Sequence, residues 1–230
     1  MRTCQASTLF SLLTDVRLAG APPSHVHGLG PLNWGDVLEI QGPSGSGKTQ
    51  LLYSLLATCV MPSAHLSIDS GGWGRAAVVF DTEGTFDTRQ LHDLLLHKLA
   101  RAFSRTNASS DAQLIALDCL RRVHVVSAAS SAQLAASIYH LPAYHAAHMP
   151  DADIALVAVD SLSAFYWPDR FMAEQLRPLG LPNSHAPLQN VLSALQSFRL
   201  SHKPITVVTN WGLTLAQNSD GPSQTMPTII

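Results

Sequence analysis

The chain reads GPSGSGKT from Gly42 to Thr49, which fits the pattern G-x-x-x-x-G-K-[ST] at every fixed position. The apolar run from Val37 to Ile40 precedes this stretch, and a helical pattern follows it. Glycines let the backbone curl until successive N–H groups point at phosphate oxygens, and the start of the following helix adds the positive end of its dipole. The sequence therefore predicts a phosphate-binding loop between a strand and a helix.

Single residues of this loop have predicted roles. Lys48 places its ammonium group near the outer phosphates of a nucleotide, and Thr49 offers its hydroxyl to Mg²⁺. ATP and Mg²⁺ are therefore the predicted cofactors, and Lys48 is a candidate catalytic residue. The predicted nucleotide-binding residues are Gly42, Pro43, Ser44, Gly45, Ser46, Gly47, Lys48, Thr49 and Gln50.

Short β-rich runs alternate with helical patterns along the rest of the chain. The predicted strands are 37–41, 76–81, 123–127, 154–160 and 204–209. The predicted helices are 48–60, 88–103, 111–121, 130–145 and 188–200. Such alternation predicts an α/β fold with right-handed crossovers, in which helices cover both faces of a mainly parallel sheet. Ligands of such sheets bind beyond the carboxyl ends of the strands.

The apolar stretch from Ile154 to Asp160 ends in a carboxylate. A phosphate loop needs an acidic residue to position its magnesium ion, and Asp160 is the predicted metal ligand that joins Thr49. In many nucleotide-hydrolysing enzymes a glutamate follows this aspartate and orients the attacking water, whereas this chain has Ser161. A general base must therefore come from another strand.

Glu83 is the candidate for this base. It lies just beyond the strand predicted at 76–81, where the backbone leaves the sheet toward the same edge. A carboxylate there can polarise a water molecule in line with the γ-phosphate. The alternatives from spacing alone are a solvated turn acid or a cap for the next helix.

Composition limits the contacts that the chain can make. It has 230 residues, of which 46% are apolar and 13% are charged, so we expect a single α/β domain and a partner that covers a sizeable face. The net charge is −2 and the only lysines are Lys48, Lys98 and Lys203, so the broad basic surface of a protein that grips nucleic acid alone is not expected. Any DNA contact should be local or shared.

Metal sites other than the magnesium site are not predicted. Three cysteines lack the spacing of a disulfide framework or a zinc site, and they are expected to be buried, reduced thiols. Eleven histidines are present, but none is joined by a carboxylate or a cysteine at a fixed offset. No run of eighteen or more apolar residues occurs, so no membrane span is predicted.

Three stretches together resemble a known family. They are DTEGTF at 81–86, the loop continuing as GKTQLL at 47–52, and the strand that ends in Asp160 and Ser161. They are similar to the ATPase core of RecA-type recombinases and their eukaryotic paralogues, and the likeness runs from about Leu9 to Trp211. The segment LSAFYWPDR at 162–170 narrows the resemblance to one type of paralogue.

This resemblance implies a RecA-like P-loop NTPase core with strand order 3-2-4-5-1, counting the predicted strands along the chain. It also implies a nuclear hetero-oligomer with other recombinase paralogue subunits, which assists the recombinase on single-stranded DNA. Glu83 matches the position of the family's water-activating glutamate. The corresponding division of the chain is an N-terminal helix (7–18) and entry segment at 1–36, the ATPase core at 37–211, and a mobile, loop-like tail at 212–230. Residues 172–187 are also expected to be loop-like.

The end of the last predicted strand departs from the family pattern. Recombinases usually have Asn-Gln there, and the glutamine senses the γ-phosphate and couples it to a DNA-binding loop, whereas Asn210 is followed here by Trp211. An indole N–H can donate a hydrogen bond but cannot accept one, and its bulk suits packing. We therefore expect DNA to stimulate ATP hydrolysis little. The chain also lacks the Phe-x-x-Ala segment by which recombinases self-assemble.

A cluster of aromatic residues with an arginine follows the strand that ends at Asp160. Its members are Phe165, Tyr166, Trp167 and Arg170, and they match a DNA loop of the family by position. Such side chains can stack on bases. Packing against the domain or a partner subunit is favoured instead, because little basic charge accompanies them.

Three functions fit these observations. The favoured one is an ATP- and Mg²⁺-binding accessory subunit in homologous-recombination repair, with weak or no turnover. The second is an active DNA-dependent ATPase in which Glu83 activates water. The third is a small-molecule kinase, which would need an arginine-bearing lid, whereas residues 172–187 contain only Arg177.

Overall fold

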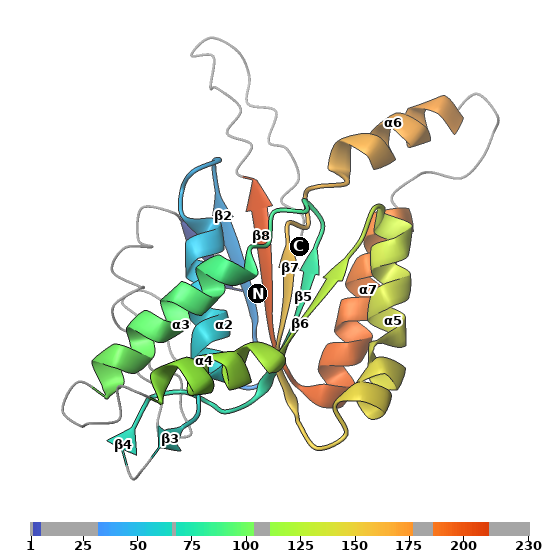
Figure 1. The fold of residues 1–230 in the computed structure, drawn as a ribbon. Helices are drawn as coiled ribbons and strands as arrows, with labels where there is room; N and C mark the ends of the chain where they lie inside the picture. Colours follow the sequence, from blue (N-terminus) through green and yellow to red (C-terminus); the bar gives the residue numbers. More distant parts are fainter. Residues whose placement is uncertain (1, 6–31, 66–67, 104–110, 177–185, 212–230) are drawn as a thin grey trace.

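A computed structural model describes residues 2–5, 32–65, 68–103, 111–176 and 186–211 of the chain. A six-stranded sheet lies at the centre of these residues, and helices cover both of its faces (Figure 1). The predicted α/β class is confirmed. The predicted N-terminal helix at 7–18 and the tail at 212–230 lie outside the described residues.

All strands of the central sheet are parallel to their neighbours. They are β1 (Arg2–Gln5), β2 (Val37–Gly42), β5 (Ala76–Asp81), β6 (Val123–Ser127), β7 (Ile154–Asp160) and β8 (Ile205–Trp211), in the order β1-β2-β8-β7-β5-β6. The five predicted strands follow the order 3-2-4-5-1, and the sheet differs from the prediction by the additional edge strand β1. A separate antiparallel pair consists of β3 (Ala64–His65) and β4 (Ile68–Asp69).

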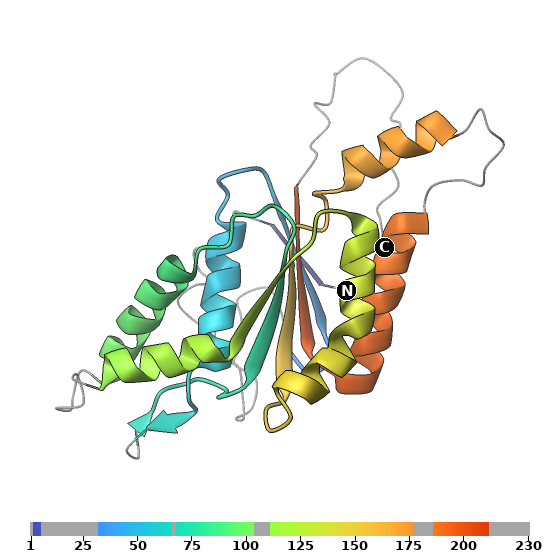
Figure 2. The same cartoon turned by 45° about the vertical axis from the view of Figure 1, so that its right-hand side comes forward.

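The helices form two layers, which Figures 1 and 2 show on opposite sides of the sheet. One layer holds α2 (Lys48–Val60), α3 (Thr88–Ala102) and α4 (Ala112–Arg121), and the other holds α5 (Ser131–His148) and α7 (Ala186–His202). Side chains alternate between these layers along β5, because successive residues of a strand point to opposite faces. Val79 packs against the first layer, whereas Val78 and Phe80 pack against the second. Both faces of the sheet are therefore buried at β5.

Helix α6 (Tyr166–Leu176) corrects the prediction that residues 172–187 are loop-like, because 172–176 are helical. Pro168 lies in the first turn of α6, where a missing N–H costs nothing. Asp169 accepts a hydrogen bond from the Ser131 hydroxyl of α5 at 2.9 Å, which ties the start of α6 to the second helix layer. The helix then extends beyond the carboxyl end of the sheet (Figure 1).

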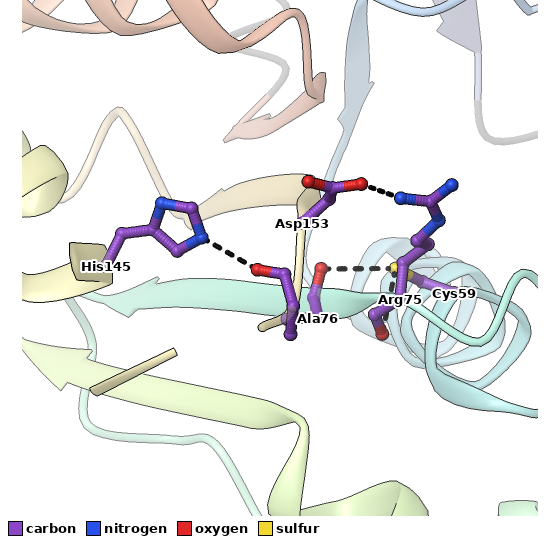
Figure 3. Close-up of polar contacts among 6 residues, drawn as sticks. Cys59, Arg75, Ala76, His145 and Asp153 are labelled. Carbon is purple, nitrogen blue, oxygen red and sulfur yellow. Dashed lines mark hydrogen bonds and ion pairs between the residues drawn. The ribbon is translucent and has the colours of Figure 1, made fainter. Parts of the chain in front are cut away.

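Polar contacts join the amino ends of β5 and β7, at the edge opposite the predicted phosphate loop (Figure 3). Arg75, which precedes β5, forms an ion pair with Asp153, which precedes β7. On α5, Nε2 of His145 lies 2.7 Å from the carbonyl oxygen of Ala152. The described residues contain no group of three or more His, Cys, Asp or Glu side chains that could hold a metal ion. The contact that His145 makes here is therefore with the backbone of Ala152, at the amino end of β7.

Two of the three cysteines belong to the core. Cys59 and Cys119 are free thiols and are buried, as predicted from the sequence. The Sγ atom of Cys59 lies 3.5 Å from the carbonyl oxygen of Ala76 (Figure 3), and burial raises the pKa of this thiol. Burial also raises the pKa of Cys119 to about 11. Both thiols are therefore protonated at neutral pH and are poor nucleophiles.

Lys98 is a partly buried cation between α3 and α2. Its Nζ atom donates to the carbonyl oxygen of Ser54 at 3.3 Å and to the hydroxyl of Thr58 at 3.1 Å. Burial, and secondarily the charge of Arg101, lowers the pKa of Lys98 from 10.5 to about 8. The ammonium group at neutral pH is therefore less favourable in the folded chain than in the unfolded chain.

We predict that Lys98→Met raises the free energy of unfolding at pH 7 by roughly 1–3 kcal/mol, because it removes this partly buried, desolvated charge. Between about pH 8 and pH 10.5 the unfolded wild-type chain binds more protons, so its stability rises with pH and the advantage of the variant shrinks. Urea unfolding across this pH range measures both effects. Lys203→Met, at an exposed lysine, is the control. A destabilised Lys98→Met variant at pH 7 would contradict the prediction.

Candidate nucleotide-binding site

The predicted phosphate loop lies at the carboxyl edge of the sheet, between β2 and α2. Strand β2 ends at Gly42 and helix α2 begins at Lys48, so the loop has the predicted strand before it and helix after it. Gly45 and Gly47 have φ angles of 75° and 87°. These angles lie in the left-handed region, which glycine adopts without steric cost and other residues rarely adopt. The glycines of GPSGSGKT therefore permit the curl of this loop.

The loop holds Lys48 in position and leaves one hydroxyl without a partner. Nζ of Lys48 donates to the carbonyl oxygens of Gly42 and Pro43, each at 3.0 Å, so the ammonium group lies against the loop itself. Oγ of Ser46 is buried without a hydrogen-bond partner among the described residues. A buried hydroxyl normally finds a partner, and a phosphate oxygen is a suitable acceptor. The loop residues therefore fit a bound phosphate group.

Thr49 and Asp160 lie side by side although 111 residues separate them. Oγ1 of Thr49, in the first turn of α2, is 3.3 Å from Oδ2 of Asp160, the last residue of β7. Thr209 of β8, the strand between β2 and β7, donates its hydroxyl to the other carboxylate oxygen of Asp160. One hydroxyl and one carboxylate thus face the same point next to the loop. This pair of oxygen ligands fits Mg²⁺, which keeps several waters and takes further oxygens from phosphates.

Asp160 is a buried carboxylate in a negative environment. Burial is the main cause that raises its pKa, and the nearby charges of Glu83 and Asp81 raise it further. The hydrogen bonds from Thr209 and Thr49 act in the opposite direction. A divalent cation bound at this position would favour the ionised carboxylate.

Asp81 shapes the turn that positions Glu83. Its carboxylate accepts hydrogen bonds from the backbone N–H groups of Glu83, Gly84, Thr85 and Phe86, at 2.8–3.3 Å. The turn is therefore fixed by the residue that ends β5. The next helix, α3, is capped by Asp87, which accepts from the N–H of Arg89. The alternative that Glu83 is the cap of this helix is thus wrong.

The Glu83 side chain points toward the ends of β7 and β8. Its Oε1 atom accepts a hydrogen bond from the Ser161 hydroxyl at 2.5 Å and from the Trp211 indole N–H at 3.1 Å. The structure therefore brings Glu83 to the same edge as Thr49 and Asp160. The roles of these residues in binding and catalysis stay predictions.

A sequence model of the family described as Rad51 matches residues 27–223 of the chain. The chain belongs to the Rad51 family. The prediction of a RecA-type recombinase paralogue is confirmed by this match, and the described residues of this Rad51-family chain have the α/β fold that the resemblance implied.

Relatives define the type of paralogue. This Rad51-family chain is 30% identical to the DNA repair protein XRCC2 of Mus musculus over 191 residues, which are 82% of this chain and 61% of that protein. It is 26% identical to the DNA repair protein XRCC2 homolog of Arabidopsis thaliana over 232 residues, with 87% and 60% covered. It is 39% identical to the DNA repair protein RAD51 homolog 1 of Arabidopsis thaliana over a shorter stretch of 62 residues, which are 27% of this chain and 17% of that protein. The chain therefore spans about three fifths of the length of these XRCC2 relatives. These matches confirm the type of paralogue that residues 162–170 predicted, since the chain is XRCC2-like.

The aromatic segment after β7 is a helix start in this Rad51-family chain. Phe165 packs against the core of the second helix layer, whereas Trp167 is 54% exposed on α6. The Arg170 guanidinium lies 5.8 Å from the centre of the Trp167 ring and forms an ion pair with Glu174 at 3.1 Å. Its Nη1 atom also donates to the hydroxyl of Tyr166 at 3.2 Å. Packing within the domain is therefore seen for Phe165, and the charge of Arg170 is already compensated.

Sequence reasoning did not find the residues that hold the acidic side chains in place. Thr209 contacts Asp160, and Ser161 and Trp211 contact Glu83. Trp211 ends β8, Ser161 follows β7 and Thr209 lies two residues before the end of β8, and the parallel order of the strands places these ends together. A polar residue at the end of the strand between β2 and β7 was the available signal for Thr209.

We predict that Thr209→Val lowers the free energy of unfolding by about 2 kcal/mol, because the buried Asp160 carboxylate loses a charge-assisted hydrogen bond. Thr209→Ser keeps the hydroxyl but removes a buried methyl group, so it should lose only about 1 kcal/mol. Guanidinium unfolding at neutral pH measures the difference between the two variants. A Thr209→Val variant as stable as the wild type would show that this hydrogen bond contributes nothing.

Proposed function

We propose that this chain binds ATP with Mg²⁺ as an accessory subunit of a complex of Rad51-family paralogues, in the homologous-recombination repair of DNA breaks in the nucleus. In this proposal, ATP turnover is weak or absent. The observation that carries the proposal is the 3.3 Å contact between Thr49 and Asp160 beside the phosphate loop. The two XRCC2 relatives, both named as DNA repair proteins, support the role in repair.

Each part of the site has a task under this proposal. The backbone N–H groups of the loop and the Ser46 hydroxyl hold phosphate oxygens, and Lys48 balances their charge. Thr49 and Asp160 hold Mg²⁺, which when bound would neutralise phosphate charge and orient the phosphates. Burial of Asp160 strengthens its attraction to a cation, because the local dielectric constant is lower than that of water.

Weak turnover is supported by the surroundings of Glu83. Oε1 of this carboxylate already accepts two hydrogen bonds, and Ser161 stands where many nucleotide-hydrolysing enzymes have the glutamate that orients the attacking water. An active DNA-dependent ATPase is the second candidate. It is favoured by one observation, the position of Glu83 at the same edge as Thr49 and Asp160.

Partner subunits are supported more strongly than direct DNA contact. The α6 residues Trp167, Phe171 and Met172 are 54%, 61% and 57% exposed among the described residues. Large apolar side chains exposed together on one helix are typical of protein interfaces. The charge of Arg170 is engaged by Glu174, and the chain as a whole carries a net charge of −2. Single-stranded DNA is therefore proposed to be bound through the complex.

No helix in the described part of the chain is long and apolar enough to cross a membrane.

We predict that the full chain binds ATP with Mg²⁺ and that Lys48→Ala weakens this binding by about tenfold or more, because a buried ammonium partner of the phosphates is lost. Isothermal titration calorimetry with a non-hydrolysable ATP analogue measures the dissociation constant. Lys203→Ala is the matched control, since Lys203 is an exposed lysine that follows α7. Equal affinities of the Lys48→Ala and Lys203→Ala variants would contradict the nucleotide site.

We predict that Trp167→Ala combined with Phe171→Ala reduces recovery of Rad51-family paralogues by about tenfold when the tagged chain is purified from cell extract, because interface aromatics contribute most of the binding energy. Mass spectrometry with and without ATP identifies the subunits. Leu114→Ala, at a 70% exposed leucine of α4, controls for the general loss of an apolar surface residue. Undiminished recovery in the double variant would exclude α6 as the partner surface.

A further inference from the structure

Trp211 ends β8 and is held at two points. Its indole Nε1 donates to Oε1 of Glu83 at 3.1 Å, and its backbone N–H donates to the Ser163 hydroxyl at 3.1 Å. The hydrogen bond to Ser163 holds the backbone of Trp211 in place, and the indole faces the turn after β5. The side chain is nevertheless 44% exposed, and its ring is not part of either core cluster of the described residues. Core packing therefore does not account for the position of the indole.

Ser161 supplies a second donor to the same oxygen. Its hydroxyl lies 2.5 Å from Oε1 of Glu83 and 3.3 Å from the Ser163 hydroxyl. Thr82, the residue before Glu83, donates its own hydroxyl to the carbonyl oxygen of Ser161 at 2.7 Å. The network thus joins the ends of β5, β7 and β8, which are neighbours in the sheet (Figure 1).

We propose that Trp211 and Ser161 form a latch on Glu83 that restrains its use as a general base. The inference rests on the proposed function, since it concerns the nucleotide site described above. Trp211 is a positioning residue in this scheme, because it acts through Glu83 and not on the nucleotide itself.

The chemistry of the two donors explains the restraint. A carboxylate oxygen has two lone-pair sites, and both sites of Oε1 are used by the latch. A water molecule can then be polarised through Oε2 alone, and the carboxylate cannot rotate without breaking two hydrogen bonds. An indole has no acceptor, so Trp211 offers nothing to a water proton in exchange. Without the indole N–H, one lone pair of Oε1 is free, and rotation of the Glu83 carboxylate breaks one hydrogen bond instead of two.

The first test is spectroscopic and needs no nucleotide. The chain has four tryptophans, so ¹⁵N-tryptophan labelling gives four indole N–H signals, and Trp211→Phe assigns the signal of Trp211. We expect Glu83→Gln to shift the Trp211 signal upfield in its proton dimension, because an amide oxygen is a weaker acceptor than a carboxylate. The Trp34 signal, assigned by Trp34→Phe, should stay unchanged. A Trp211 signal that is the same in the wild type and in Glu83→Gln would overturn the latch.

The second test separates restraint from a merely structural role. Trp211→Phe keeps an aromatic ring but removes the N–H, and we expect it to raise kcat for ATP hydrolysis about fivefold, the rate equivalent of one ordinary hydrogen bond, with an unchanged Kd for ATP. Trp34→Phe is the matched control, because Trp34 is 50% exposed and precedes β2, at the opposite end of this strand from the phosphate loop. An unchanged or lower kcat in Trp211→Phe would overturn the restraint.

The two readouts distinguish the latch from the proposed function. ATP binding together with a Trp211 signal that ignores Glu83→Gln overturns the latch and leaves the nucleotide site in place. In the opposite case the Trp211 signal responds to Glu83→Gln but the chain binds no ATP. The contact between Trp211 and Glu83 then exists, but the proposed function is overturned, and the contact has no general base to restrain. Charged groups at the same edge of the described residues include Asp81, Asp160 and Lys48, and both tests are run at one pH so that their ionisation is constant.

Discussion

The meeting of Thr49 and Asp160 depends on the order of three strands. The phosphate loop follows β2, Asp160 ends β7, and β8 lies between them. Because the strands are parallel, all three carboxyl ends reach the same edge, and Thr209 on the middle strand can donate to the Asp160 carboxylate. A sheet with β1 and β2 exchanged would move the hydroxyl and the carboxylate apart by a further strand spacing of about 5 Å. The site therefore depends first on the order of the strands, and only then on the individual side chains.

Three carboxylates gather at this edge, and each is stabilised in a different way. Asp81 accepts four backbone N–H groups and fixes a turn. Glu83 accepts two side-chain donors, and Asp160 accepts the hydroxyls of Thr209 and Thr49. Asp81 and Asp160 are both buried, and the pKa of Asp160 is raised mainly by burial and further by the charges of Glu83 and Asp81. A cation that binds beside Asp160 would relieve repulsion among all three, which gives the proposed magnesium site an electrostatic basis in the chain itself.

The sequence predicted the parts of this fold that local patterns determine. The loop GPSGSGKT and the apolar run that ends in Asp160 were enough to place a hydroxyl and a carboxylate at one edge, since parallel strands leave little freedom. Helix α6 was not predicted, and its first turn contains Pro168, which a helix tolerates at that position. The contact of Trp211 with Glu83 spans 128 residues and depends on side-chain direction at two strand ends. No periodicity or spacing records such a contact, so only the coordinates could show it.

The latch and the partner surface have a common physical logic under the proposed function. A subunit that uses ATP as a structural ligand needs tight phosphate and metal contacts, which Lys48, Thr49 and Asp160 offer, but it gains nothing from rapid hydrolysis. Binding energy that is equal in the ground state and the transition state holds a nucleotide without accelerating its reaction. Two donors that occupy one oxygen of Glu83 act in the same direction, because they leave the binding residues untouched and limit the base. The exposed apolar residues of α6 then provide a surface on the same carboxyl side of the sheet (Figure 1). Nucleotide occupancy and partner binding could thereby be linked through β7, whose end carries Asp160 and leads into α6.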